Sequence, residues 1–441
     1  MQRLKTTKTP LLLLLVLGLA TFVLIALHYL GGAPGETEAE AQQWPEKNQS
    51  RTTISRVAVL ESTGWHDEVV AALVYAIGQQ PSTTALTLYL KARRYGIDQL
   101  YAAFAPQASI FPARRMRDFL DLPGGSLPAP DVVVLATGER DFANHADIIH
   151  HLFTSSPHTR LLCVVHHAAQ WEAGRMPEKL LPFVLPWVEA GRITFLTLAP
   201  HVADHLSTIA IPAWRGQVST PARTPLRARV ETWVPVFEVA QAGLAAQRTS
   251  VRAGETAFAI QGNFDPGRRN YDGVLSRLRS DGQAAGLTLH LLGSGKGVKV
   301  PQGLEGRVVV DSGLAYLPYY AIIARSVALV PSFATDDYYV ERASSTVAAS
   351  LIAGCPLVAS RRLLATYTYL DESVVWVQEE DEDEMDVVIR VGHERTAAER
   401  SAKNDNVRRR NLELCARSVR QFDRWILEAT AARPDIDDSQ A

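Results

Sequence analysis

Residues 289–297 read LHLLGSGKG, residues 307–332 read RVVVDSGLAYLPYYAIIARSVALVPS, and residues 337–360 read DYYVERASSTVAASLIAGCPLVAS. The first run is apolar and ends in a loop of small residues, and a second strand pattern follows it. A Tyr-rich helical pattern then leads to an apolar run that ends at Pro331-Ser332. After a polar loop, a helix of small residues stops at Gly354-Cys355-Pro356. Strands that alternate with helices in this way predict a parallel, doubly wound α/β sheet.

The same alternation covers most of the chain. Apolar runs predict five earlier strands, with helical spacing between them, at 56–62, 83–90, 131–138, 160–167 and 192–200. These runs are almost continuously apolar, as expected for parallel strands that are buried on both faces. A second series of strands begins at FAIQGNF (258–264) and continues to VVWVQEE (374–380), and a long helical pattern follows it at 397–432.

This order of elements resembles the nucleotide-sugar half of GT-B glycosyltransferases, in particular the "glycosyl transferases group 1" (family 4-like) enzymes. The resemblance implies two Rossmann-like doubly wound domains, with WVPVFEV (233–239) as the short strand that ends the first. It also implies a hexosyltransferase-like enzyme that moves a sugar from a nucleotide-sugar donor to a glycan or glycoconjugate acceptor. No cofactor and no metal are expected, because GT-B enzymes generally work without one. Donor, acceptor, linkage and the choice between retention and inversion stay open.

The resemblance assigns the third segment quoted above to sugar and ribose binding. Group 1 enzymes carry a Glu, seven residues and a second Glu. Glu341 takes the first position, which contacts the transferred sugar, whereas Ala349 stands at the second. Alanine cannot accept the hydrogen bonds that a Glu takes from ribose hydroxyls. A catalytically silent GT-B scaffold that binds glycans or proteins is therefore the alternative function.

The other candidate donor-binding residues lie at strand ends and at a helix start. Open parallel sheets bind nucleotides at the carboxyl ends of their strands, where helix N-termini and glycine turns offer N–H groups to phosphate. Eight residues meet these conditions: Gly262, Asn263, Gly293, Ser294, Ser332, Ser344, Ser345 and Thr346. Simple turns or helix caps are the alternative explanation for them.

Three further residues are candidates for catalysis. Arg268 and Arg269 follow the strand FAIQ, and the resemblance implies that such residues neutralise the departing diphosphate; guanidinium groups suit phosphate. The alternative is a surface loop with two solvated arginines. His166, followed by His167, comes after the strand RLLCVV, where group 1 enzymes often place a His that faces the transfer site. A packed or solvent-facing histidine is the alternative there.

The N-terminal part has a different composition. Residues 11–30 are almost wholly apolar, and about twenty helical residues at 1.5 Å each span a ~30 Å hydrocarbon core. Basic residues precede the segment and acidic residues follow it, which predicts a single-pass type II signal-anchor with the body in the lumen of the Golgi or endoplasmic reticulum. A cleaved secretory signal is the alternative. Asn48-Gln49-Ser50 is an N-glycosylation sequon, so Asn48 is expected to carry a glycan, which would make the chain a glycoprotein.

Composition and charge limit the classes of partner and of cysteine chemistry that remain open. The net charge of −2 gives no field that favours nucleic acid, so none is expected as a partner. The three cysteines are far apart and fit neither a zinc site nor a disulfide framework. The expected organisation is a cytosolic tail at 1–10, a transmembrane segment at 11–30, a luminal stem at 31–52, an N-terminal acceptor domain at 53–240, a nucleotide-sugar domain at 255–400, a C-terminal crossing helix at 401–432 and a disordered tail at 433–441.

The first prediction concerns the membrane. Because residues 11–30 are long enough to remain as an anchor, the full chain should stay in the membrane pellet after carbonate extraction. Mass spectrometry of the mature protein should recover peptides from residues 1–30. A variant with three leucines of this segment changed to lysine should lose the retention. A mature protein that begins after Gly31 and is released by carbonate would show that the segment is a cleaved signal.

Overall fold

The computed structural model describes residues 55–81, 84–119, 129–172, 174–175, 180–214, 228–239 and 256–432. The expected anchor at 11–30, the stem, Asn48 and the tail at 433–441 lie outside these residues. Among the described residues, none of the helices combines the length and the apolar composition needed to cross a membrane. The described residues all belong to one compact unit, and their strands form two sheets.

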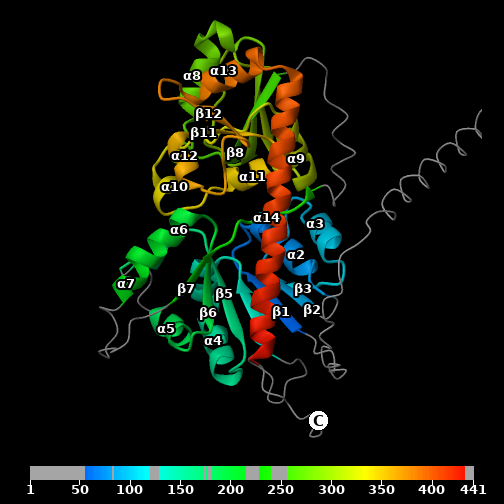
Figure 1. Ribbon diagram of the computed structural model, residues 1–441, viewed down its shortest axis with the longest axis vertical. Helices are drawn as coiled ribbons and strands as arrows, with labels where there is room; N and C mark the ends of the chain where they lie inside the picture. The colour runs from blue at the N-terminus through cyan, green and yellow to red at the C-terminus, as the bar shows by residue number, and fades with distance from the viewer. Residues whose placement is uncertain are drawn as a thin grey trace, which may run out of the picture. The chain divides into compact units, whose positions relative to one another are not determined.

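The first sheet, with the helices that cover it, is called the first lobe here (Figure 1). Its described strands are all parallel and have the order β3-β2-β1-β4-β5-β6-β7. They span Ser55–Glu61 (β1), Thr84–Leu90 (β2), Ser109–Pro112 (β3), Val132–Leu135 (β4), Arg160–Val165 (β5), Ile193–Thr197 (β6) and Arg229–Thr232 (β7). The helices span Asp67–Gly78 (α2), Asp98–Phe104 (α3), Gly138–Ser155 (α4), Leu181–Glu189 (α5), Pro200–His205 (α6) and Ile211–Ala213 (α7).

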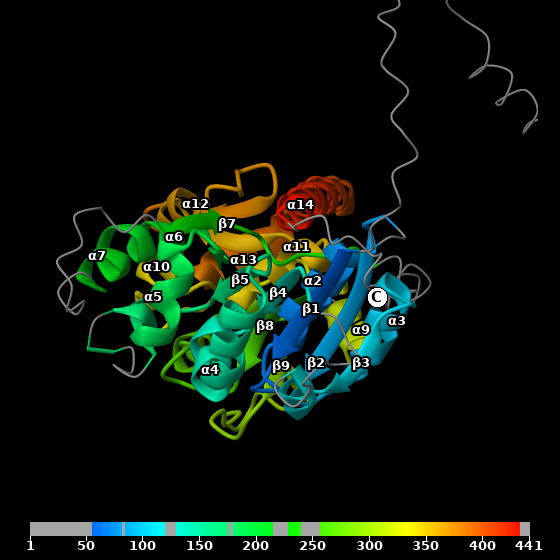
Figure 2. The ribbon, with the colours of Figure 1, turned by 90° about the horizontal axis from the view of Figure 1, so that it is seen from below.

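The central strands explain why this sheet forms. All residues of β4 and β6 are buried, as is every residue of β5 after Arg160, because helices cover both faces. Figure 2 shows α4 on one side of the sheet and the long helix α14 on the opposite side. All five expected strands of this region are present.

Two details of the first lobe differ from the sequence-based expectation. Edge strand β3 was not expected, because its four residues SIFP carry no clear apolar run and end in proline. The strand expected at WVPVFEV was wrong: β7 ends at Thr232, before that segment. Pro235 lacks the N–H that a strand would use, and the side chains around it pack into the core instead.

The second lobe is built on the second sheet. Its strands span Thr256–Asn263 (β8), Leu287–Ser294 (β9), Val308–Ser312 (β10), Leu357–Ser360 (β11) and Val375–Gln378 (β12). The orders are β10-β9-β8 and β11-β12, and the apolar run 327–330 joins the two groups by backbone hydrogen bonds to β8 and to Pro356 and Val358. The helices span Tyr271–Ser280 (α8), Tyr316–Arg325 (α9), Asp337–Val340 (α10), Ser345–Ala353 (α11), Arg361–Thr366 (α12), Glu384–Glu394 (α13) and Ala397–Ala431 (α14).

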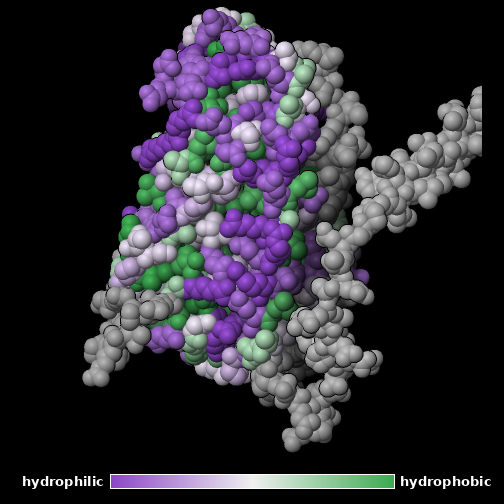
Figure 3. Space-filling view, in the orientation of Figure 1, coloured by the Kyte–Doolittle hydropathy of each residue, from purple (hydrophilic) through white to green (hydrophobic). Residues whose placement is uncertain are grey.

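Helix α14 packs on elements of both lobes. It has 35 residues, begins with a capping box at Thr396 and Glu399, and packs on α11 and α2. At 1.5 Å per residue it is about 52 Å long, which is enough to span both lobes. The main hydrophobic core is continuous from the first lobe to Tyr320, Val347 and Leu351 of the second. The outward face of α14 is mainly hydrophilic (Figure 3).

The end of α11 yields a prediction about stability. Gly354 caps this helix with φ +68°, and a Cβ there would lie 2.6 Å from Cγ of Arg408 on α14. An L-residue in this left-handed conformation costs about 1–2 kcal/mol. Gly354→Ala should therefore lower the free energy of unfolding by about that amount.

Urea unfolding of the purified protein measures this effect. Gly282→Ala is the matched control, because a Cβ there meets no atom within 4 Å. The control should change the free energy of unfolding by no more than about 0.5 kcal/mol. Equal effects of the two substitutions would contradict the capping role of Gly354.

Candidate functional site

The ends of β8 and β9 meet in a backbone contact that only glycine permits. Gly262 and Gly293 are partners in the parallel ladder, and a Cβ on Gly293 would lie 1.8 Å from the carbonyl oxygen of Gly262. Asn263 and Ser294 follow them, with Ser294 Oγ 3.4 Å from Asn263 Oδ1. The four predicted residues are thus neighbours at the carboxyl end of the sheet, where nucleotides bind in open α/β folds.

The start of α11 faces the same strand ends. Ser344 is its N-cap and accepts the Thr346 N–H at 3.2 Å. The side-chain amide of Gln261, at the end of β8, donates to the hydroxyls of Ser345 at 3.1 Å and Thr346 at 2.9 Å. Ser344 and Thr346 are buried, whereas Ser345 is exposed. The structure therefore brings these three predicted residues next to Gly262, and it leaves Ser345 accessible to a ligand.

Arg269 is buried beside this helix start. Only 3% of the residue is exposed, and its Nη2 donates to the Thr346 hydroxyl at 2.9 Å. Its guanidinium lies 5.2 Å from the ring centre of Phe333 and 5.1 Å from that of Tyr338. Every one of these partners is neutral.

Arg268 adds a second positive charge. Its Nε donates to the hydroxyl of Tyr338 at 2.8 Å. Burial raises the pKa of Tyr338, but Arg269 and Arg268 outweigh burial and leave that pKa below its usual value. Among the described residues, neither Arg268 nor Arg269 forms an ion pair with a carboxylate. Two unpaired guanidinium groups beside a helix N-terminus form a site that can bind a dianion.

Ser332 lies in a strained turn that supports the site. Its φ is +46°, the residue is 2% exposed, and its N–H donates to Glu384 Oε1 at 3.0 Å. Its hydroxyl donates to the carbonyl oxygen of Asn270 at 3.2 Å. Burial raises the pKa of Glu384 to about 7, although the backbone N–H of Ser332 and the charge of Arg269 act against this. The polar groups of Ser332 are thus used within the protein, which favours a positioning role.

Glu341 bridges the two lobes. Its Oε1 lies 2.8 Å from Nε2 of His167, and Nη1 of Arg175 lies 3.9 Å from the same oxygen. The backbone carbonyl of Glu341 accepts the N–H of Ala168 at 2.8 Å. About one sixth of the Glu341 side chain is exposed, 17%. A sugar that binds to this carboxylate would therefore compete with His167.

His166 lies on the first-lobe side of the same contact. Its Nε2 lies 2.8 Å from the carbonyl oxygen of Ala136, and its backbone N–H donates to Glu139 at 2.8 Å. Its ring lies 4.0 Å, centre to centre, from the ring of His66. Burial, followed by the charges of His166 and Arg268, holds the pKa of His66 well below its usual value. The ring of His66 is therefore neutral at neutral pH, and it adds no positive charge beside His166 and Arg268.

One group of side chains could hold a metal ion among the described residues. Ligand atoms of Glu172, His205 and Glu341 lie within 4.8 Å of one another. Glu172 Oε1 is 2.7 Å from His205 Nε2, and Arg175 lies near both carboxylates. Because His205 and Arg175 already contact the carboxylates, these carboxylates have partners without a metal ion. The expectation of a metal-free site stays a prediction.

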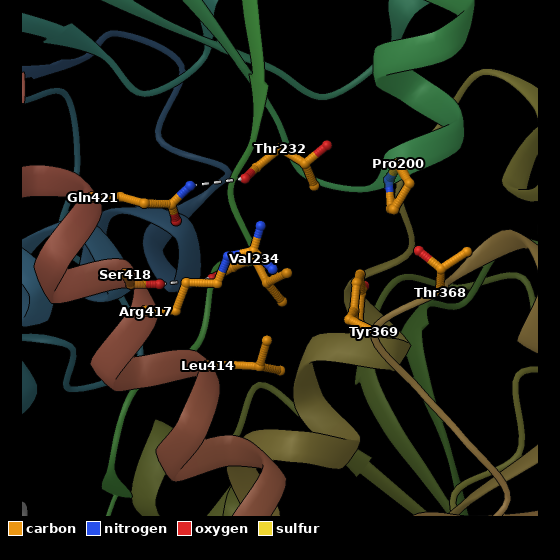
Figure 4. Close-up of a pocket in the computed structure, with 9 residues that line it drawn as sticks. All are labelled: Pro200, Thr232, Val234, Thr368, Tyr369, Leu414, Arg417, Ser418 and Gln421. Atoms are coloured by element: carbon orange, nitrogen blue, oxygen red, sulfur yellow. Dashed lines mark hydrogen bonds between the residues drawn. The ribbon is translucent and has the colours of Figure 1, made fainter.

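A pocket on the side of α14 is separate from this site (Figure 4). It has a volume of about 200 Å³. In the figure, Gln421 and Ser418 of α14 reach across to the backbone at Thr232 and Val234. The pocket contains none of the predicted site residues, since its lining is Pro200, Thr232, Val234, Thr368, Tyr369, Leu414, Arg417, Ser418 and Gln421.

Sequence reasoning missed several residues of the site. Gln261 ends an apolar strand, and its place directly before Gly262 was an available signal. His66 is an isolated histidine after β1, and Tyr338 is one of two adjacent tyrosines, so neither stands out in a linear reading. Glu384 lies in the acidic run 379–386, whose composition is typical of a solvated loop. The last part of this run instead begins α13.

Comparison with solved structures supports the fold. No model of a known protein family matches the sequence, and no curated protein matches it. The structure of HepE from Anabaena in complex with UDP is similar, with 12% identity, a TM-score of 0.54, and 84% of this chain and 98% of that chain covered. A complex of HepE with UDP-glucose has 13% identity and a TM-score of 0.52, with 86% and 100% covered.

Two other solved structures are similar to a comparable degree. Sucrose-phosphate synthase from Thermosynechococcus elongatus has 12% identity and a TM-score of 0.51, with 86% of this chain and 100% of that chain covered. An alpha-glucosyltransferase in complex with UDP has 10% identity and a TM-score of 0.53, with 80% and 95% covered. At these identities the likeness establishes the GT-B architecture of two parallel-sheet lobes and no more.

A pH-dependent prediction follows from Glu384. Its pKa in the folded protein is raised from 4.5 to about 7, so between these values the folded state binds more protons than the unfolded state. The free energy of unfolding should therefore fall as the pH rises from about 4.5 to about 7, through this group. Glu384→Gln removes the ionisation and keeps an oxygen that can accept the Ser332 N–H.

Urea unfolding at pH 5 and pH 8 compares the variant with the wild type. Glu384→Gln should gain stability relative to the wild type on going from pH 5 to pH 8. Glu380→Gln, at an exposed position of the same acidic run, is the control and should show no such gain. A constant difference between Glu384→Gln and the wild type at both pH values would refute the assignment.

Proposed function

We propose that this chain is a glycosyltransferase, hexosyltransferase-like, that moves a sugar from a nucleotide-sugar donor to a glycan or glycoconjugate acceptor. The observation that carries the proposal is the pair of unpaired guanidinium groups of Arg268 and Arg269 beside the N-terminus of α11. They lie at the carboxyl end of the β8-β9 sheet, next to Gly262 and Gly293.

The electrostatics of Arg269 favour a phosphate ligand. A buried charge is unfavourable unless it is paired, and Arg269 forms no ion pair among the described residues: its hydrogen bonds go to neutral hydroxyl and carbonyl groups, and the carboxyl of Glu384 feels its charge from a greater distance. A diphosphate would supply the missing negative charge, and guanidinium groups bind phosphate oxygens through paired hydrogen bonds. In a transfer reaction the same two arginines would stabilise the charge that develops on the departing nucleoside diphosphate.

The ligands of similar structures agree with this chemistry. The HepE and alpha-glucosyltransferase structures are complexes with UDP, and one HepE structure is a complex with UDP-glucose. Those statements concern the other proteins. They support a uridine nucleotide sugar as the first donor to test on this chain.

Sugar and ribose would be held differently from the group 1 pattern. Glu341 would accept sugar hydroxyls after His167 turns away from it. Ala349 is buried inside α11 and offers no acceptor to the ribose. The hydroxyl of Ser350 is bound to the carbonyl oxygen of Cys355 at 2.6 Å, so Ser345 is the exposed hydroxyl left nearby. We assign ribose contact to Ser345 and to backbone groups at the start of α11.

The catalytically silent scaffold is the second candidate function. Two observations favour it: the carboxylate of Glu341 is already bound to His167, and position 349 is alanine. For the cellular setting, we propose a type II membrane protein with its body in the lumen of the Golgi or endoplasmic reticulum. The apolar segment 11–30 and its basic leading flank support this setting.

Donor binding separates the two candidate functions. Titration calorimetry of the full chain with UDP-glucose and with UDP should show binding that weakens about tenfold or more in Arg268→Ala and in Arg269→Ala. Transfer or hydrolysis of the donor should fall by roughly 10²–10³-fold in the same variants. Arg279→Ala, at an exposed position of α8, is the control and should leave both unchanged.

Because Arg269 is buried, near-UV circular dichroism should first confirm that each variant is folded. Half-buried Arg268 provides the second, structurally milder test. Tight donor binding without any transfer or hydrolysis would favour the scaffold. Failure of the folded wild type to bind any uridine, guanosine or adenosine diphosphate sugar would overturn the proposal.

A further inference from the structure

The loop after β1 holds a tryptophan out to solvent. Trp65 is 69% exposed, more than any other large hydrophobic residue of the described chain. Large aromatic side chains normally bury most of their surface, and one that stays exposed in an ordered loop is a candidate for contact with a partner.

The exposure of Trp65 is not the result of a loose loop. The carboxylate of Glu61, a residue only 1% exposed, accepts the N–H of Thr63 at 3.0 Å and that of Gly64 at 2.8 Å. The hydroxyl of Thr63 also bonds to this carboxylate. Gly64 has φ +75°, so the turn itself depends on glycine. The residue before Trp65 is therefore held in one conformation.

A second buried carboxylate holds the start of the same loop. Asp141, fully buried, accepts both the N–H of Ser62 at 2.9 Å and its hydroxyl at 2.6 Å. Asn144 donates to the hydroxyl of Ser62 at 2.9 Å. Two buried acids and an amide thus hold the three residues that precede the exposed indole, Ser62, Thr63 and Gly64. Such rigidity lowers the entropy lost when a ligand stacks on the ring.

Trp65 lies at the first-lobe side of the candidate site. The next residue, His66, places its ring against His166, whose backbone carbonyl accepts the N–H of Ala343 in the second lobe. Trp65 thus stands one residue from the contact between His66 and His166, where the two lobes meet. A ligand on Trp65 would approach the donor sugar from the opposite lobe.

The surface beside Trp65 is basic. Gly64 packs against Ala92, with Nη2 of Arg94 3.2 Å from the place of a Gly64 Cβ. Lys91, Arg93 and Arg94 are all exposed on this neighbouring loop. Arg93 pairs with Asp98, but both side chains are about half exposed, so the pair is weak and exchangeable. The loop that carries these three exposed cations thus packs against the turn that carries Trp65.

We propose that Trp65, Lys91, Arg93 and Arg94 form the acceptor subsite, and that it takes a saccharide that carries a negative charge, either a carboxylate or a phosphate. The apolar face of a pyranose ring stacks on the indole, and the anionic group binds the guanidinium and ammonium groups. This subsite rests on the proposed glycosyltransferase function and adds to it the class of acceptor. A neutral sugar would use the ring but would offer no negative charge to Lys91 and Arg94, or to Arg93 in competition with Asp98.

Binding measurements on the full chain test the subsite. The probes are a hexuronic-acid oligosaccharide, glucose 6-phosphate, and the neutral sugar maltose, each titrated by calorimetry at 50 mM and 200 mM salt, with UDP measured in parallel. At least one anionic probe should bind about tenfold more tightly than maltose, and higher salt should weaken it. The two anionic probes distinguish a carboxylate from a phosphate as the recognised group.

Variants assign the effect to residues. Trp65→Ala should weaken the anionic probe about tenfold, Trp65→Phe should retain most of the binding, and Lys91→Gln/Arg93→Gln should abolish the preference over maltose. Because these residues are exposed, the variants should fold normally and bind UDP as the wild type does. Arg279→Ala is the surface-charge control.

Each outcome has one meaning. Equal binding of maltose and the anionic probes, or no effect of Trp65→Ala, overturns the acceptor subsite while normal UDP binding leaves the proposed donor function intact. Tight binding of an anionic probe that depends on Trp65, without any UDP binding, supports the subsite as a saccharide site and overturns the donor function.

Discussion

The structure depends on a short backbone pairing between the two lobes. The segment 166–168, at the carboxyl end of β5, pairs in antiparallel fashion with the segment 341–343, between α10 and α11. The N–H of Ala168 donates to the Glu341 carbonyl, and the side chains of His167 and Glu341 meet at the same point. This contact sets how closely the sheet ends of the two lobes approach, so it decides which side chains can act on one ligand.

The charges on the second lobe are incomplete without a ligand. Several arginines of the described chain have acidic partners, as Arg277 has with Asp383 and Asp386. Arg268 and Arg269 have a tyrosine hydroxyl, a threonine hydroxyl and carbonyl oxygens instead. The protein thus keeps two cations fixed by neutral groups, which preserves their charge for an anion and keeps them in place before it arrives.

The sequence predicted the strands and helices well because buried parallel strands and capped helices leave local patterns. The fully buried run VVVL and the cap at Ser344 are examples. What it could not predict depends on contacts between distant segments. The partner of Glu341 is 174 positions away, and the acidic run that hides Glu384 resembles any solvated loop. No sequence pattern predicts that Trp65 is exposed, because its exposure depends on hydrogen bonds to Glu61 that form only in the folded chain.

The three cysteines have a practical consequence for studies of motion. Cys163, Cys355 and Cys415 are all buried and free, and burial raises the pKa of each thiol, that of Cys415 to about 12. Thiolates are the reactive form, so these residues should resist maleimide reagents at neutral pH while the protein is folded. The natural chain is therefore a nearly silent background for labelling. Two cysteines introduced on exposed positions of opposite lobes could carry a fluorophore pair or spin labels, and the distance between them would report directly on opening and closing.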